Sequence, residues 1–334
     1  MQSKLWGGSF SMTNTLSSLS VAKIRQAFLT SNKTISLCLL SQMQKDSRQG
    51  VQKLARTLQK RQEREQQERH RIQSMLNYER LLWSSGVHYV AGVDEVGIGS
   101  LAGPVVAAAT IFKPEVFIPG INDSKVLTSR TRDRLAKLIR QQALATAIGV
   151  AEVREVDQVN VYRAGLLAMK RAVQKLSLQP EQLLTDAREI PGILIPQASL
   201  KKGDSISFSI AAASILAKTH RDEIMAQLGQ LYPEYGFSQH KGYATSKHQK
   251  AIQLHGACCA HRSFDFVNEL CGRHSTLFYE LRSEVAALGS AKEVRQFKKK
   301  LVCIQNQLHP SEGKKIRLLL RRHLKNTARC FQHR

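Results

Sequence analysis

The most informative residues are two adjacent acids that follow an apolar segment. Residues 88–93 read as a strand and lead directly into Asp94 and Glu95, and Gly97, Gly99 and Gly103 come soon after. Two carboxylates at a strand end are unfavourable unless solvent or a cation neutralises them. Such ligands suit a hard divalent cation such as Mg²⁺, and glycines let a ligand approach the backbone closely. Taken alone, however, this pattern more often marks an acidic turn.

Two further acids lie at the ends of other predicted elements. Asp186 ends a short apolar strand at 183–186, and Asp204 precedes a long alanine-rich helix at 206–231. An acid beside a helix N-terminus is ordinarily a cap. If both acids meet Asp94 and Glu95 in one domain, the four carboxylates could hold a pair of metal ions. Such a pair stabilises the attacking and leaving oxygens in phosphodiester cleavage.

The elements that would position these acids alternate between strand and helix. We predict further strands at 105–112 and 145–150 and further helices at 129–142 and 245–255. Between residues 159 and 176, apolar side chains recur at intervals of three and four, which predicts a helix with one buried face. Strands followed by helices of this length indicate an α/β domain.

Charge is distributed unevenly over the 334 residues, whose formal net charge is +24. Residues 1–86 contain 14 Lys and Arg against 5 Asp and Glu, and residues 268–334 contain 15 against 5. Two basic flanks therefore surround a nearly balanced middle. Such an excess indicates a polyanionic partner, with nucleic acid as the first candidate, although a basic structural protein would show the same balance.

Several strings in the middle of the chain carry a resemblance to one family. In chain order they are DEVGIGSLAGPVVAA at 94–108, NDSK at 122–125, KGD at 202–204, SIAAASILAK at 209–218, Arg221-Asp222, HKGY at 240–243 and HRSF at 261–264. With these strings in this order, the chain resembles the ribonuclease HII family from about residue 89 to residue 267. Asp46-Ser47-Arg48 and Tyr78-Glu79-Arg80 also resemble the N-terminal extension of longer bacterial members.

The resemblance implies a ribonuclease-H-like α/β fold, a mixed sheet flanked by helices. We expect a disordered segment at 1–18, a helical extension at 19–86, the catalytic domain at 87–268 and a basic, partly helical extension at 269–334. The last extension would contact phosphates without sequence preference, or else be a solvated tail. The implied reaction is hydrolysis of RNA paired with DNA, including cleavage 5′ to single ribonucleotides in duplex DNA, leaving 3′-hydroxyl and 5′-phosphate ends.

The resemblance also implies roles for individual residues. By motif match, Asp94, Glu95, Asp186 and Asp204 are the catalytic ligands of Mg²⁺ or Mn²⁺. Asp222 is a less favoured ligand, because a surface ion pair is the ordinary role of an acid at its helix position. Tyr243 would stack on the sugar next to the ribonucleotide. Ser214 and Lys218 lie one helical turn apart and could face the phosphate path, whereas Lys125 and Lys202 could contact phosphates or be solvated. The full set of other implied substrate contacts is Gly97, Ile98, Gly99, Lys125, Lys202, Ser214 and Lys218.

Three positions depart from the family pattern. The usual Gly-Arg-Gly is Gly97-Ile98-Gly99 here, Asp-Gly is Asp186-Ala187, and the glycine after Gly-Tyr is Ala244. Ile98 lacks the positively charged guanidinium group of arginine, which donates two parallel hydrogen bonds to phosphate. This change puts substrate affinity and junction selectivity in question. Ile98 could instead pack on an apolar neighbour, with a basic residue elsewhere supplying the phosphate contact. The alternative function is a nucleic-acid-binding protein of the same fold with weak or lost cleavage.

The remaining sequence features concern location and assembly. The six cysteines have no zinc-like spacing and are typical of reduced thiols in a cytoplasmic protein. The first 45 residues contain no acid and could form an organellar targeting segment, which we favour less. No stretch is apolar enough to span a membrane. From these features we expect a cytoplasmic protein, and we also expect a monomer. The resemblance implies that it acts on RNA–DNA hybrids and ribonucleotide-containing DNA, in ribonucleotide excision, replication and repair.

Overall fold

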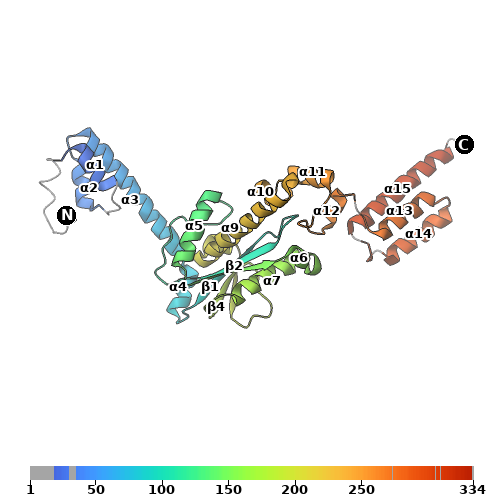
Figure 1. Ribbon diagram of the computed structural model, residues 1–334, viewed down its shortest axis with the longest axis horizontal. Helices are drawn as coiled ribbons and strands as arrows, with labels where there is room; N and C mark the ends of the chain where they lie inside the picture. The colour runs from blue at the N-terminus through green and yellow to red at the C-terminus, as the bar shows by residue number, and fades with distance from the viewer. Residues whose placement is uncertain (1–18, 30–34, 273, 305, 309, 333–334) are drawn as a thin grey trace.

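The computed structural model describes residues 19–29, 35–272, 274–304, 306–308 and 310–332 (Figure 1). A helical part comes first along the chain, a sheet domain lies in the middle, and a second helical part lies at the other end of the molecule. We expected disorder at residues 1–18, which lie outside this description, and the targeting segment that we considered for the first 45 residues lies partly outside it. Among the described residues, no helix combines the length and apolarity needed to cross a membrane.

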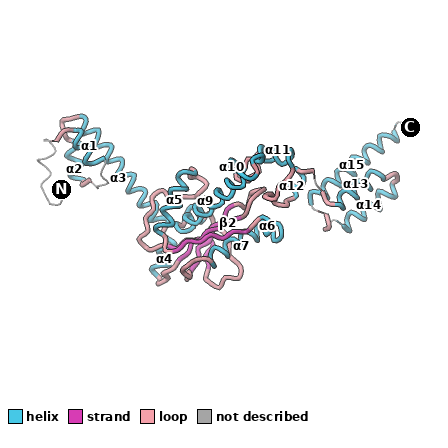
Figure 2. Tube along the Cα trace, viewed as in Figure 1, coloured by secondary structure: helices cyan, strands magenta, loops and turns pink. Residues whose placement is uncertain are grey.

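The middle part is built on a mixed five-stranded sheet with the order β3-β2-β1-β4-β5. The strands of this sheet are coloured magenta in Figure 2. Its strands are β1 (Val90–Val96), β2 (Val105–Ile111), β3 (Ala145–Ala151), β4 (Gln182–Asp186) and β5 (Gln197–Leu200). β2 is antiparallel to both β1 and β3, whereas β4 is parallel to both β1 and β5. The predicted mixed sheet is confirmed, with two differences in detail. β1 runs on to Val96 and so contains Asp94 and Glu95, and β5 was not predicted.

Helices cover both faces of the sheet. One face carries α5, α8 and α9, and the other carries α6 and α7. Their bounds are α5 (Ser129–Gln142), α6 (Val153–Val159), α7 (Val161–Gln174), α8 (Gly203–Ile206) and α9 (Phe208–Leu231). The helix predicted to start near residue 159 begins only after Asn160, whose φ of 71° separates α6 from α7. The predicted bounds of α5 agree with the structure.

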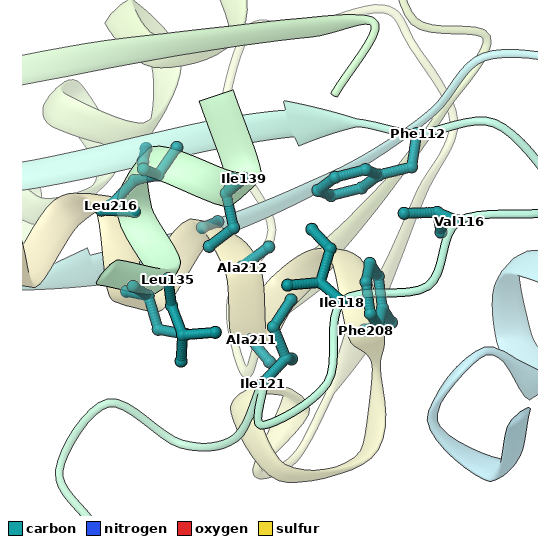
Figure 3. Packing of buried hydrophobic residues seen from close by; sticks show 14 of the residues in the cluster. Phe112, Val116, Ile118, Ile121, Leu135, Ile139, Phe208, Ala211, Ala212 and Leu216 are labelled. Carbon is teal, nitrogen blue, oxygen red and sulfur yellow. The ribbon is translucent and has the colours of Figure 1, made fainter. Parts of the chain in front are cut away.

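The core between α9, α5 and the sheet is packed with aliphatic and aromatic side chains (Figure 3). Phe112 and Phe208 meet edge to face there, with ring centroids 5.1 Å apart. α9 lies directly against β1, because Gly92 has no side chain to separate them. A Cβ at Gly92 would lie 2.2 Å from the carbonyl carbon of Ser209. This close approach brings the N-terminal half of α9 next to Asp94.

The helical parts at the two ends have apolar cores of their own. In the N-terminal part, α1 and α2 pack against the first half of α3, and the last turn of α3 joins the core of the middle part. The helices are α1 (Val21–Leu29), α2 (Leu37–Gln44), α3 (Gln49–Met75) and α4 (Asn77–Ser84). Beyond α9 come α10 (Phe237–His240), α11 (Ser246–His255), α12 (Asp265–Leu270), α13 (Thr276–Ala287), α14 (Ala291–Ile304) and α15 (Pro310–Gln332).

Candidate metal and nucleic-acid site

Three of the four predicted carboxylates lie together at one edge of the sheet. Parallel β1 and β4 pair Val93 with Thr185, so Asp94 and Asp186 are the next residues of neighbouring strands. Asp204 reaches the same place from α8. Carboxylate oxygens of the three residues lie within 4.8 Å of one another. Asp94 and Asp204 are each only 4% exposed, so water neutralises their charge poorly.

The electrostatics of this cluster favour a bound cation. Burial raises the pKa of Asp94 well above its usual value, and the charges of Glu95 and Asp186 raise it further. Burial also raises the pKa of Asp186, although the N–H of Gly203 donates a hydrogen bond to its Oδ1 at 2.8 Å. A cation between the carboxylates would replace this mutual repulsion with attraction. Buried oxygen ligands at this spacing fit a hard divalent ion.

Ser214 and Lys125 hold two of these carboxylates. The hydroxyl of Ser214 hydrogen-bonds to Asp94 and lies 2.8 Å from the hydroxyl of Ser124. We expected Ser214 on the phosphate path, but it is buried, because its face of α9 packs against the sheet. Lys125 places its Nζ 2.9 Å from Oδ2 of Asp204, while its side chain is 73% exposed. Burial lowers the pKa of Lys125, but the hydrogen bond and charge of Asp204 outweigh burial and raise it.

Glu95 points to the other face of β1, since successive side chains of a strand alternate. Its Oε1 lies 3.0 Å from Nη1 of Arg188, and its Oε2 is buried without a hydrogen-bond partner. Burial raises the pKa of Glu95, although the charge of Arg188 lowers it. Arg188 also covers the ring of Tyr162, at 4.9 Å from the centroid. Arg188 was not predicted, and its position two residues after Asp186 is the only signal for it in the sequence.

Two buried arginines hold the glycine-containing loop at 97–104. Their guanidinium groups donate to the carbonyl oxygens of Ile98, Ser100, Ala102, Gly103, Pro104 and Lys241. Arg221 and Arg262 are both fully buried. Gly97 has a φ of 98°, and a Cβ there would lie 2.4 Å from Nε of Arg221. Within the described residues, the N–H groups of Ile98 and Gly99 donate to no protein acceptor, so they remain available to a ligand.

Ile98 lies at the α7 side of this loop. It packs against the core beneath α7, and a Cβ on Gly165 of α7 would lie 2.9 Å from its Cδ1. The same point lies 3.5 Å from Nη1 of Arg188. Ile98 therefore makes the apolar contact that we named as an alternative, and a guanidinium lies beside it.

Tyr243 is half-buried next to the loop and pairs with Ser100 in a short β-bridge. The guanidinium carbon of Arg221 and Nζ of Lys218 lie 5.5 and 5.8 Å from its ring centroid. Both distances fit attraction between a cation and an aromatic ring. Two cationic side chains of α9 thus contact the ring of Tyr243, and the part of the ring that they leave uncovered is partly exposed.

The remaining predicted residues lie outside the carboxylate cluster. Asp222 is paired with Arg132 at 3.0 Å and with Lys218, which is the ordinary ion-pair role of such an acid. Lys202 is exposed and has a φ of 58° immediately before Gly203. Lys218 thus contacts both the carboxylate of Asp222 and the ring of Tyr243, whereas the side chain of Lys202 is exposed to solvent.

Comparison with known proteins identifies the family of this chain. The ribonuclease HII family model matches residues 91–267, and the ribonuclease HII N-terminal domain model matches residues 20–83. The chain belongs to the ribonuclease HII family. It is thus an endonuclease of the ribonuclease H type, and the longer form with an N-terminal extension is confirmed.

Curated relatives carry the same name. Ribonuclease HII of Anaeromyxobacter sp. (strain Fw109-5) is 47% identical over 258 residues, which cover 77% of this chain and 82% of the relative. Ribonuclease HII of Myxococcus xanthus (strain DK1622) is 44% identical over 254 residues, or 75% and 87% of the two chains. The crystal structure of ribonuclease H2 from Pyrococcus horikoshii OT3 is 22% identical, with a TM-score of 0.48, and the match covers 55% of this chain and 96% of that one.

Proposed function

We propose that this enzyme cleaves the RNA strand of RNA–DNA hybrids and also cuts 5′ to single ribonucleotides embedded in duplex DNA, leaving 3′-hydroxyl and 5′-phosphate ends. The observation that carries the proposal is the cluster of buried Asp94, half-buried Asp186 and buried Asp204, whose carboxylate oxygens lie within 4.8 Å of one another. This cluster lies at the end of β1, and the loop with free N–H groups begins just beyond it. One chain supplies all of these residues, so we propose that the monomer acts.

The donor set fits two divalent cations, Mg²⁺ or Mn²⁺. Carboxylate oxygens of Asp94, Asp186 and Asp204 lie within 4.8 Å of one another, and Oε2 of Glu95 is buried with no hydrogen-bond partner. These four residues would hold the ions, which would stabilise charge on the attacking and leaving oxygens of the phosphodiester. Lys125 offsets part of the charge of Asp204 and, being largely exposed, is placed to turn toward a substrate phosphate.

The loop and Tyr243 provide a basis for choosing a ribonucleotide. A 2′-hydroxyl can accept and donate hydrogen bonds, and deoxyribose lacks it. The free N–H groups of Ile98 and Gly99 can donate to this hydroxyl, and Gly97 lets the loop pack directly against Arg221. Because Arg221 and Arg262 fix the loop carbonyls, these donors are held in place before the substrate binds. Tyr243, beside the loop, would stack on the neighbouring sugar.

Cationic side chains around the site would bind phosphates. Ile98 offers no charge, so we assign the contact at that position to Arg188, which lies beside Ile98 and whose side chain is 26% exposed. A guanidinium binds phosphate through two parallel donors. Lys202 and Lys218 would contact phosphates farther along the duplex.

A DNA duplex with one embedded ribonucleotide tests this proposal. With Mg²⁺ or Mn²⁺ we expect one cut 5′ to the ribonucleotide and no cut in the all-DNA duplex. Asp94→Asn and Asp186→Asn should remove nearly all cleavage but keep binding, because these carboxylates act on charge in the transition state. Asp222→Asn, the same chemical change outside the cluster, should keep cleavage. If the intact protein binds both duplexes and cuts neither the embedded ribonucleotide nor a hybrid, the proposal is wrong and the binding-only alternative holds.

A further inference from the structure

The last three helices form a separate unit with its own apolar core. The core side chains come from α13, α14, α15 and the segments between them, and they are Phe278, Leu281, Val285, Leu288, Phe297, Leu301, Leu308, Ile316 and Leu320. Neither family model reaches these residues, since the matches end at residue 267. In Figure 1 the unit lies at the opposite end of the molecule from α1 and α2. The C-terminal extension therefore has an internal structure that the reaction described above does not require.

The acids of this region are mostly used internally. Glu312 is buried and accepts hydrogen bonds from the N–H and hydroxyl of Ser275. Glu293 accepts from two backbone N–H groups at the start of α14. Glu284 pairs with Lys300 at 2.6 Å, and Glu269 lies 3.9 Å from Lys315. Four of the five acids in residues 268–334 thus serve the unit or its junction with α12.

The basic residues, by contrast, are mostly exposed and unpaired. On α14, Lys292, Arg295 and Lys299 recur at the spacing of one helix face, and α15 repeats that spacing. The α15 residues are Lys314, Arg317 and Arg321. All six residues on the two helices are exposed, and none of them forms an ion pair with a described acid. We call these two sets the α14 stripe and the α15 stripe. Both lie away from the helix faces that form the core, since Phe297 and Ile316 point inward.

The unit is attached next to the proposed substrate loop. Val267 of α12 packs with Leu101, a loop residue, and with Ile252 of α11. α12 ends at Leu270 and α13 begins at Thr276, so only a short segment separates the loop's packing partner from the unit. A binding element tethered this closely would act at a high effective concentration on any duplex that the loop contacts.

We propose that the α14 and α15 stripes bind the phosphate backbone of duplex nucleic acid without sequence preference, as a second anchor for the enzyme. The charge is of the right sign and is not consumed by internal pairs. The stripes also carry no aromatic side chain on which an unpaired base could stack, which favours a duplex over a single strand. This proposal adds to the proposed function, but binding can be measured without cleavage.

The test compares three triple variants of the full chain. K292Q/R295Q/K299Q removes the α14 stripe, and K314Q/R317Q/R321Q removes the α15 stripe. The control K53Q/R56Q/K60Q removes exposed basic residues with the same spacing from α3. Gln is a good helix former, so the folds should survive, which circular dichroism would check. Affinity for an all-DNA duplex is then measured against salt in EDTA.

Each phosphate contact contributes roughly 0.9 to the slope of log K against log salt. We therefore expect at least one stripe variant to reduce the slope by about 2–3, and the α3 control to reduce it by less than about 1. Unchanged slopes in both stripe variants would overturn the proposal. An equal reduction in the control would also overturn it, because net charge alone would then explain binding. The duplex carries no ribonucleotide and EDTA removes divalent cations, so this assay measures binding alone. A protein that binds here as expected, but in the cleavage assay cuts neither the embedded-ribonucleotide duplex nor a hybrid, refutes the proposed function and not this inference.

Discussion

Replacing Asp94 with Asn should stabilise the metal-free protein while abolishing cleavage. Asp94 is buried, with carboxylate oxygens of Asp186 and Asp204 within 4.8 Å. Two unit charges at that distance repel by about 3.5 kcal/mol at an effective dielectric constant of about 20. The carboxamide has the same volume and keeps an oxygen that can accept from Ser214. After allowing for weaker hydrogen bonds to a neutral acceptor, we expect a net gain of about 1–2 kcal/mol.

The pH dependence follows from the same repulsion. Burial and neighbouring charges raise the pKa of Asp94 in the folded protein. The folded state therefore keeps this proton to a higher pH than the unfolded state, and stability is lost as pH rises between the two pKa values. The Asn variant should lack this part of the loss.

Thermal unfolding in EDTA at pH 7 measures the effect. A gain of 1 kcal/mol raises Tm by roughly 2–4 °C for a domain of about this size, so we expect a rise of about 2–8 °C. Asp222→Asn is the matched control. It removes a carboxylate that attracts Arg132 and Lys218, so its Tm should fall. Mg²⁺ or Mn²⁺ should raise the Tm of the unaltered protein more than that of Asp94→Asn. If Asp94→Asn melts at or below the unaltered protein in EDTA, the carboxylates do not repel one another as argued.

Three further predictions concern neighbouring residues. Burial lowers the pKa of His248 and His261 from 6.5 to about 4, so the free energy of unfolding should fall as the pH drops through that range. The His261→Gln variant should lose less of this free energy than the unaltered protein, and equal losses in denaturant titrations would contradict the prediction. Ala187 has a φ of 56°, so Ala187→Gly should raise the free energy of unfolding by about 0.5–1 kcal/mol, and an unchanged denaturation midpoint would show that no strain exists. Arg188→Met should raise KM for an embedded-ribonucleotide duplex roughly tenfold, with a smaller effect on kcat. Adding Ile98→Arg to this variant should restore much of the lost affinity. An unchanged KM in Arg188→Met would show that Arg188 does not contact the phosphate.

The parts of the fold with a strong local signal were predictable from the sequence. The amphipathic pattern of α5 predicted its bounds, and the apolar runs before Asp94 and Asp186 identified both acids as strand-end candidates. Their meeting was not predictable from spacing, because it depends on the parallel pairing of β1 with β4. β5 was missed because its four residues are partly exposed and show no apolar alternation.

Side chains that act from inside the domain were the hardest to predict. The first ten residues of α9, 208–217, are mostly apolar and are buried on every side, so nothing in this stretch of sequence shows which way Ser214 points. Buried arginines are rare, and in a sequence Arg221 and Arg262 look like solvated charges. The role of Arg188 depends on its contact with Glu95, which is distant in the chain and lies on another strand. Contacts of this kind become visible only when the strands are assembled.

Arg221 and Arg262 should also make the proposed attraction for nucleic acid partly independent of ionic strength. Both guanidinium groups are buried, and within the described residues neither has a carboxylate within ion-pair distance. Burial lowers the pKa of Arg262 only to about 9, so it stays charged at neutral pH. Dissolved ions screen charges on the surface far better than charges inside a protein. A steady positive potential should therefore persist behind the loop and Tyr243 in concentrated salt, after the contacts of exposed lysines have been lost.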